Sequence, residues 1–326
     1  GTVDFTVTVT VNPTIDPNVT ITNNACFDVD TASITTNITG GIPPYTINWA
    51  GPNGFTSSNT SISNLEPGIY TLSVENIGNC PFTNSYTITE PSELLITTNS
   101  ENDSSCFESN NGSIDITVSG GTGAYSYSWT KDTVPFATTQ DLNNLSPGVY
   151  SVTITDQNNC GPKTATYTIT EPPLLVVSLL SQTNITCFGS ATGQINVGVE
   201  GGTAATNYNF SWTGPNGFTS TNQNLTSIIA GTYNLTVTDD NGCLKTLEVI
   251  LSQSTEIIIA YTTTVTTCFA GNDASLSVSL SGGNAPYTFV WDNLATSLTQ
   301  NNLSAGNYTI TVTDNLGCTK VLTINI

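Results

Sequence analysis

Hydrophobic and polar residues alternate with a period of two along most of this chain. Tyr45, Ile47 and Trp49 alternate with threonine and asparagine, and Tyr70 and Leu72 lie in a similar segment further on. Such alternation is typical of β-strands that bury one face. Turn-forming pairs such as Asn-Gly, Pro-Gly and Gly-Gly separate these segments. The pattern predicts an all-β fold built from antiparallel β-sandwiches.

The pattern occurs four times. Each copy contains Cys-Phe, Gly-Gly, a strand with tryptophan, a Gly-x-Tyr segment and a closing cysteine. The opening cysteines are spaced by 80, 81 and 81 residues, which suits a small domain, so we predict a tandem array. The expected parts are the last strand of a preceding module at 1–12 and Ig-like modules at 13–92, 93–173, 174–253 and 254–326.

Short joints connect the predicted modules. Two of them contain Thr-Glu-Pro, at 89–91 and 170–172, and the third, at 251–254, is similarly short. Short joints stiffened by proline limit the swing between neighbours, so we expect an elongated rod. The chain has no signal peptide, although its cysteines indicate export. We therefore expect it to be an internal piece of a longer chain, with adjacent modules as its first partners.

Eight aromatic residues are predicted to lie in the cores of the modules. Each tryptophan occupies the same place on the strand after Gly-Gly, where a sandwich packs a ring between its two sheets. Each Gly-x-Tyr segment resembles the tyrosine corner of Ig-type sandwiches, in which the hydroxyl ties off a strand crossover. A platform for stacking sugars is the alternative for the tryptophans. The eight residues are Trp49, Trp129, Trp212, Trp291, Tyr70, Tyr150, Tyr233 and Tyr308.

The eight cysteines fall two to each copy, and no Cys-x-x-Cys pair occurs. This spacing favours disulfides in an oxidising compartment over a metal framework. One pairing lies within each copy and closes a loop of 50–56 residues, worth about 4 kcal/mol in the chain-entropy model. We favour it because so small a unit needs its own staple. It joins Cys26 to Cys80, Cys106 to Cys160, Cys187 to Cys243 and Cys268 to Cys318.

A staggered pairing is the alternative. In a strict Ig topology the opening and closing cysteines lie at opposite ends of the sandwich, whereas a disulfide needs Cα atoms within about 7 Å. Stacking would bring the top of one unit against the bottom of the next. The staggered disulfides would join Cys26 to Cys160, Cys106 to Cys243 and Cys187 to Cys318.

Composition excludes several classes of function. The net charge is −20, with 4 basic and 24 acidic residues, which argues against nucleic acid and anionic lipid as partners. The absence of histidine removes Ser-His-Asp and Cys-His catalysis, and no apolar run has transmembrane length. We expect no enzymatic activity and no cofactor. Ca²⁺ binding by carboxylates is the alternative reading of the charge.

Three sequence segments carry a family resemblance. The segments Gly40–Trp49, Leu65–Tyr70 and Val237–Cys243 together resemble the SprB-type repeat, which is also similar to PKD and Ig-like surface modules. That repeat occurs in large surface adhesins of gliding Bacteroidota. The resemblance implies a cell-surface filament that is exported by type IX secretion and propels cells. The first copy departs from the pattern, since Glu75 and Asn76 stand where the others close with Thr-Asp.

The resemblance also implies a modification. In these organisms Asp-Ser or Asp-Thr followed by a small or aliphatic residue marks O-glycosylation. Asp30-Thr31-Ala32 and Asp132-Thr133-Val134 fit this pattern, so Thr31 and Thr133 are the candidate acceptors.

The leading hypothesis is a non-enzymatic structural stalk of a long extracellular adhesin or surface filament, serving adhesion and gliding. One alternative is a carbohydrate-binding module array that uses the loops after Trp49, Trp129 and Trp212 to bind surface polysaccharide. Another is an accessory region of a secreted polysaccharide-degrading enzyme. Other adhesin copies are a further candidate partner.

Overall fold

The computed structural model describes every residue except 9, 10, 12, 79 and 204–207. The chain forms two compact units, the first made of 1–104 with 109–170 and the second of 105–108 with 171–326. The terminal strand predicted at 1–12 lies partly outside the described residues. Residues 1–8 and 11 are exposed and carry no strand assignment.

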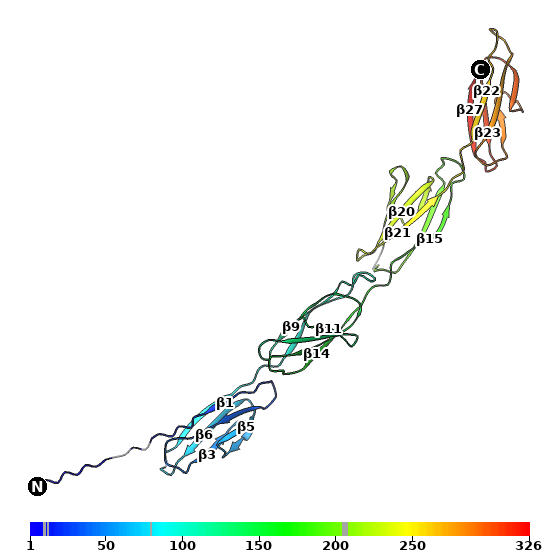
Figure 1. Ribbon diagram of the computed structural model, residues 1–326. Coiled ribbons are helices and arrows are strands. Elements are labelled where there is room, and N and C mark those ends of the chain that lie inside the picture. Colours follow the sequence, from blue (N-terminus) through cyan, green and yellow to red (C-terminus); the bar gives the residue numbers. More distant parts are fainter. Residues whose placement is uncertain (9–10, 12, 79, 204–207) are drawn as a thin grey trace. The chain divides into compact units, whose positions relative to one another are not determined.

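The first unit holds two pairs of sheets, called repeat 1 and repeat 2 (Figure 1). Repeat 1 consists of β1 (Thr20–Thr22), β2 (Ala32–Thr35), β3 (Thr46–Ala50), the 3₁₀ turn η1 (Pro52–Gly54), β4 (Thr56–Ser57), β5 (Ser61–Leu65), β6 (Gly68–Glu75) and β7 (Phe82–Ile88). Repeat 2 consists of β8 (Leu95–Asn102), β9 (Gly112–Ser119), β10 (Ser126–Lys131), β11 (Val134–Ala137), β12 (Leu142–Leu145), β13 (Gly148–Thr155) and β14 (Lys163–Ile169).

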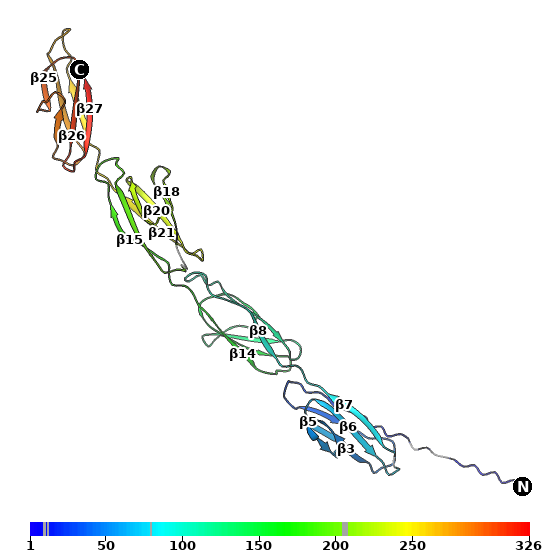
Figure 2. The same ribbon diagram turned by 180° about the vertical axis from the view of Figure 1, so that it is seen from behind.

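The second unit holds repeats 3 and 4, which Figure 2 shows from behind. Repeat 3 consists of β15 (Val176–Thr183), β16 (Gly193–Glu200), β17 (Asn209–Thr213), η2 (Pro215–Gly217), β18 (Thr219–Ser220), β19 (Leu225–Ile228), β20 (Gly231–Thr238) and β21 (Leu244–Leu251). Repeat 4 consists of β22 (Ile258–Thr263), β23 (Ala274–Ser281), β24 (Thr288–Trp291), β25 (Thr299–Leu303), β26 (Asn307–Thr313) and β27 (Thr319–Asn325).

The strand order is that of an Ig-type sandwich. In repeat 2 the sheet β12-β9-β8 packs on the sheet β11-β10-β13-β14, so the first, second and fifth strands form one layer. This is the A-B-E and C′-C-F-G arrangement of Ig folds. Repeats 1 and 3 have the same order, and repeat 4 has a three-stranded second sheet, β24-β26-β27. The predicted fold class of tandem Ig-like β-sandwiches is confirmed, while the residue boundaries predicted for the modules remain predictions.

The alternation seen in the sequence creates one core per repeat. In β13, Tyr150, Val152 and Ile154 are fully buried, while Val149 on the opposite face is 43% exposed. Trp129 lies opposite Val152 in the register of β10 and β13, between the two sheets. Truncating a tryptophan buried in this way to alanine typically costs about 3–5 kcal/mol. The four predicted tryptophans are at most 1% exposed: Trp49, Trp129, Trp212 and Trp291.

The polar atoms of these aromatic residues bond to backbone carbonyls. The indole N–H of Trp129 donates to the carbonyl of Thr139 over 2.9 Å, and the hydroxyl of Tyr150 donates to the carbonyl of Ser146 over 2.8 Å. The tyrosine bond reaches back four residues, which is the geometry of a tyrosine corner. Corner tyrosines of the other repeats make the same bond: Tyr70, Tyr233 and Tyr308.

The Gly-Gly pair is required by close packing against the segment that precedes β8 and against the turn that follows β13. A Cβ on Gly120, which has a φ of +79°, would lie 1.9 Å from the carbonyl oxygen of Glu93. A Cβ on Gly121, at φ +63°, would lie 3.0 Å from the carboxylate of Asp156. Both positive φ angles favour glycine. The hydroxyl of Tyr125 closes the turn by donating to the Gly120 carbonyl over 2.7 Å.

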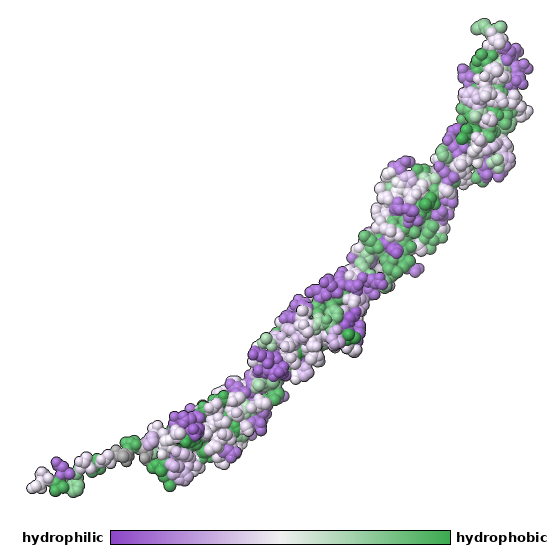
Figure 3. Space-filling model, viewed as in Figure 1, coloured by the Kyte–Doolittle hydropathy of each residue, from purple (hydrophilic) through white to green (hydrophobic). Residues whose placement is uncertain are grey.

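The segment after each of the first three tryptophans contributes a phenylalanine that packs edge-on against the corner tyrosine. Ring centroids are 5.3–5.5 Å apart in the pairs Phe55–Tyr70, Phe136–Tyr150 and Phe218–Tyr233. The edge-to-face geometry is a favourable aromatic contact. These segments therefore contribute to the fold of repeats 1 to 3. Figure 3 shows hydrophobic and hydrophilic residues interspersed on the visible face of every repeat.

Candidate functional site: disulfide joints

The disulfides follow the staggered pattern. Cα atoms are 5.4, 5.7 and 5.4 Å apart in the pairs Cys26–Cys160, Cys106–Cys243 and Cys187–Cys318, called joints 1, 2 and 3. Joint 1 lies in the first compact unit, and joints 2 and 3 lie in the second. Each of the first three opening cysteines is joined to the closing cysteine of the following repeat. The pairing within copies is therefore wrong, and Cys80 and Cys268 are exposed free thiols.

The strand topology explains the correction. Cys106 precedes β9, whose first residue Gly112 lies against Ile169, and Ile169 pairs with the first residue of β13. Cys160 follows the last residue of β13. The eight residues of β13 separate the two cysteines by roughly 26 Å at 3.3 Å per residue, far beyond the reach of a disulfide. Within one sandwich the two cysteines cannot meet.

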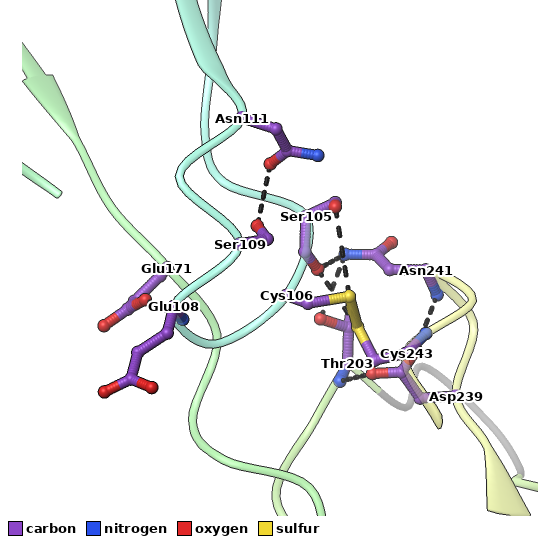
Figure 4. Close-up of a disulfide and its surroundings, with 10 residues drawn as sticks. All are labelled: Ser105, Cys106, Glu108, Ser109, Asn111, Glu171, Thr203, Asp239, Asn241 and Cys243. Carbon is purple, nitrogen blue, oxygen red and sulfur yellow. Dashed lines mark hydrogen bonds between the residues drawn. A yellow bond between two sulfur atoms is a disulfide. The ribbon is translucent and has the colours of Figure 1, made fainter. Parts of the chain in front are cut away.

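A carboxylate shapes the turn that holds each of the three bonded closing cysteines. In repeat 3 the Oδ1 atom of Asp239 accepts hydrogen bonds from the N–H groups of Asn241 and Cys243, over 3.1 and 2.8 Å. Its Oδ2 atom accepts from the N–H of Thr203 over 2.8 Å, and the side chain is only 2% exposed (Figure 4). Asp156 and Asp314 do the same in repeats 2 and 4. The buried carboxylates are thus occupied by backbone donors.

The opening loop docks on this turn through its own backbone. At joint 2 the side-chain amide of Asn241 donates to the carbonyl of Ser105 over 2.9 Å (Figure 4). At joint 1 Asn158 donates in the same way to the carbonyl of Ala25, over 3.0 Å. Joint 3 has Leu316 at this position of the turn. The amide contact therefore accompanies two of the three joints and is not required for the disulfide.

The Thr-Glu-Pro segments hold the opening loop from the other side. The N–H of Asp28 donates to the carboxylate of Glu90 over 2.9 Å, and that of Glu108 donates to Glu171 over 2.6 Å. At the third joint Gln253 takes the place of the glutamate. From the sequence alone these segments are predicted to be stiff linkers only. The recurrence of Glu, Glu and Gln two residues after the last core residue of each repeat was the signal of this second role.

Asp314 gives joint 3 a pH dependence. Burial alone would raise the pKa of Asp314, but the N–H groups of Cys318, Asn284 and Leu316 stabilise the carboxylate, and its pKa lies below the usual value. A carboxylate with a depressed folded-state pKa contributes stability above the unfolded pKa of about 3.9 and loses it as the pH falls through the folded value.

We expect the free energy of unfolding of repeat 4 to fall in acid for this reason. The variant Asp314→Asn should lose that part of the acid dependence. It should also be less stable at neutral pH, because its amide faces the N–H of Asn284. Urea unfolding between pH 7 and pH 2.5 measures both effects. Parallel curves for the two proteins would contradict the assignment.

The other predicted site residues lie apart from the joints. Thr31 and Thr133 are exposed, the latter in the turn between β10 and β11. The buried tryptophans leave no ring face for stacking a sugar. In the part of the chain that the structure describes, no cluster of three or more acidic, cysteine or histidine side chains could hold a metal ion. The same part contains no helix with the length and hydrophobicity of a membrane span.

Comparison with known protein families gives one match in each repeat. The family profile of the SprB repeat matches residues 18–54, 98–134, 179–217 and 260–296. The chain carries four matches to the SprB repeat. Each SprB match runs from the first strand of a repeat through the loop after its tryptophan, so it includes the opening cysteine. The corner tyrosine and the closing cysteine lie beyond it. No curated protein sequence matches the chain.

Solved structures with tandem domains are similar at low identity. The three N-terminal domains of the outer capsid protein Hoc of bacteriophage RB49 share 15% identity with a TM-score of 0.40, covering 72% of this chain and 98% of that one. Eight Ig domains of the cell adhesion molecule DSCAM share 15% with a TM-score of 0.31, covering 97% and 48%. Five Ig domains of Sidekick-1 share 14% with a TM-score of 0.29, covering 94% and 76%.

Proposed function

We propose that this chain is a non-enzymatic structural region of an extracellular surface adhesin, in which disulfides brace successive repeats. The matches to the SprB repeat support the surface role. The observation that carries the bracing role is the staggered pairing of six cysteines. Disulfides of this kind persist in oxidising environments such as the cell surface.

The bracing follows from which residues the disulfides join. Each repeat has its own buried core, so it does not depend on a disulfide to close its sandwich. The cross-links instead tie each opening loop to a turn that belongs to the next copy of the pattern. By the chain-entropy model, closing a loop of 131–137 residues is worth about 5 kcal/mol. This stabilisation is shared by neighbouring repeats, which suits a chain that transmits tension.

The proposed role in gliding rests on the resemblance to gliding adhesins. In this proposal the repeats form a stalk that is exported by type IX secretion and moved along the cell surface during gliding. A stalk needs length and resistance to force more than it needs a ligand site. The occupied carboxylates and the buried aromatic rings are consistent with that requirement.

Surface labelling tests the proposal. An antibody raised against the 326-residue chain should label intact cells of the source organism as strongly as permeabilised cells, while an antibody against a cytoplasmic protein should label only permeabilised cells. In protein released from those cells, Cys26, Cys106, Cys187 and their partners should resist alkylation until a reductant is added. Labelling confined to permeabilised cells, or six reactive thiols, would overturn the proposal.

A further inference from the structure

Repeat 4 differs from the other three repeats in the hairpin that follows its tryptophan. In those repeats β4, β11 and β18 pair with the strand that carries the tryptophan, and a phenylalanine next to or within that short strand packs on the corner tyrosine. In repeat 4 the strand β24 ends at Trp291 and is an edge strand of the described sheet. Residues 292–298 contain no aromatic residue. The shorter hairpin therefore leaves one edge of this sheet without its usual cover.

The corner tyrosine of repeat 4 is correspondingly uncovered. Tyr308 is only half-buried, whereas its three counterparts are at most 2% exposed. Its hydroxyl still donates to the carbonyl of Ser304 over 3.0 Å, so the corner itself is formed. A Cβ on Gly306 would meet nothing within 4 Å, while a Cβ on the corresponding glycine of the other repeats would lie 2.3–2.5 Å from a side chain that follows the tryptophan. We call the surface formed by β24, Gly306 and Tyr308 the open edge of repeat 4.

Asp292 marks the point where the pairing of β24 with β26 ends. Its N–H donates to the carbonyl of Thr309 over 3.0 Å, and its carboxylate accepts from the N–H of Thr309 over 3.0 Å. In repeat 2 the same two bonds join Asp132 to Val149, one residue after the corner glycine, whereas Thr309 lies three residues after it. The pairing in repeat 4 thus stops two residues earlier, which leaves Tyr308 at the open edge.

A following repeat is not what covers this position elsewhere in the chain. Repeats 1 and 3 are each followed by another repeat in their own compact unit. Among the described residues, those that line the hollows at joints 1 and 3 include no residue of these hairpins. Both repeats nevertheless cover their corner tyrosine with their own phenylalanine. The open edge therefore arises from the sequence of repeat 4 itself and not from its place in the chain.

The other repeats show which chemistry fits the open edge. They place a phenylalanine ring with its centroid 5.3–5.5 Å from that of the corner tyrosine, beside a short antiparallel strand. Repeat 2 adds Lys131, whose Nζ atom lies 5.7 Å from the centroid of the Tyr150 ring, which is a cation–π contact. A cation also suits repeat 4, because the exposed carboxylate of Asp292 bonds next to Tyr308 and the chain has a net charge of −20.

The sequence of this chain offers no spare segment with that chemistry. Of its four lysines, two form ion pairs with glutamates, and Lys131 already lies over Tyr150. The remaining one, Lys245, has no aromatic residue within five positions on either side. A segment that combines an aromatic side chain with a cation must therefore come from a different protein.

We propose that the open edge of repeat 4 binds an extended segment of a partner protein that carries an aromatic residue and a lysine or arginine. The segment adds a strand beside β24, its ring packs on Tyr308, and its cation lies near Asp292. In strand addition of this kind, main-chain hydrogen bonds give affinity and side-chain contacts give specificity. The site goes beyond the proposed structural role, and surface labelling decides that role independently of any binding here.

A synthetic peptide tests the site on the full chain. The acetylated, amidated heptapeptide Thr-Val-Lys-Thr-Phe-Thr-Ser places its lysine and phenylalanine two residues apart, on one face of a strand. In NMR spectra of the chain with ¹³C-labelled tyrosine rings, it should shift the signals of Tyr308, assigned through Tyr308→Phe, and leave those of the other corner tyrosines unchanged. Replacing the peptide's phenylalanine by alanine should weaken binding roughly tenfold or more.

Two protein variants separate the ring contact from the charge. Replacing residues 292–294 by residues 213–219, the hairpin of repeat 3, supplies a covering phenylalanine and should abolish the shifts. Asp292→Asn keeps an acceptor for Thr309 and should weaken the lysine peptide about two- to fivefold, while a peptide with glutamine in place of lysine should bind both proteins equally. Unchanged tyrosine signals from repeats 1 to 3 show that each variant is folded.

Several results would overturn the proposal. They are unshifted Tyr308 signals at millimolar peptide, equal shifts at all four corner tyrosines, and undiminished binding to the protein with the grafted hairpin. Shifts of Tyr308 that appear without peptide as the protein concentration rises would identify a second copy as the occupant and would equally overturn it.

Discussion

The oxidised chain should extend under force to only a fraction of its contour length. The shortest covalent route between the termini crosses joints 1 and 3 and follows the backbone for about 60 residues, roughly 210 Å at full extension. After reduction the whole backbone carries the load and reaches roughly 1,100 Å. Single-molecule stretching with and without dithiothreitol, with Cys80 and Cys268 replaced by serine, measures this difference.

Two double variants separate the disulfides. Replacing Cys26 and Cys160 by serine removes joint 1, and the shortest route then runs through joints 2 and 3 over about 170 residues, roughly 600 Å. Replacing Cys106 and Cys243 removes joint 2, which the shortest route does not use, so the extension should stay near 210 Å. A longer extension of this second variant would show that the disulfides are paired differently.

Gly201→Ala should unfold or severely destabilise repeat 3. Gly201 and Gly217 share a φ of +75°, but a Cβ on Gly201 would lie 2.0 Å from the carbonyl oxygen of Leu174, while a Cβ on Gly217 would meet nothing within 4 Å. Gly217→Ala should therefore cost only the backbone strain of about 1–2 kcal/mol. Gly201→Ala adds a clash with backbone atoms that cannot rotate away, so we expect a loss of at least 4 kcal/mol.

Hydrogen exchange localises the effect of these variants. Loss of protection in Gly201→Ala should be confined to β15–β21, and Gly217→Ala should keep nearly normal protection there. Similar protection in both proteins would mean that the segment before β15, which contains Leu174, can shift to admit a methyl group.

Local pattern determined how much of the fold could be predicted. Period-two alternation identified the strands. The fixed places of Trp129 and Tyr150 identified the core, because every residue at such a position lies on the buried face of its strand. The pairing of Cys106 was harder, because it depends on which end of the sandwich each turn reaches. That is a property of strand order, which the alternation does not encode. The expectation that so small a unit needs its own disulfide favoured the wrong pairing, since each sandwich core is closed without a disulfide inside it.

The contacts of the joints were beyond the sequence for a related reason. Glu90 and Asp28 are separated by 62 residues, and their hydrogen bond exists only because the opening loop returns to the end of its own sandwich. The packing of Phe136 on Tyr150 likewise depends on a hairpin that differs from its counterparts in length and sequence. In a sequence such contacts show only as residues that recur at the same position of several repeats with no local reason to do so.

The overlap of the three disulfide loops has a consequence for survival outside the cell. Every peptide bond between Cys26 and Cys318 is enclosed by at least one of the pairs Cys26–Cys160, Cys106–Cys243 and Cys187–Cys318. A protease that cuts once anywhere in this span leaves both fragments attached through sulfur. Severing the chain there takes several cuts, or a cut together with a reductant. A chain built in this way tolerates damage at any one of its exposed loops and stays in one piece.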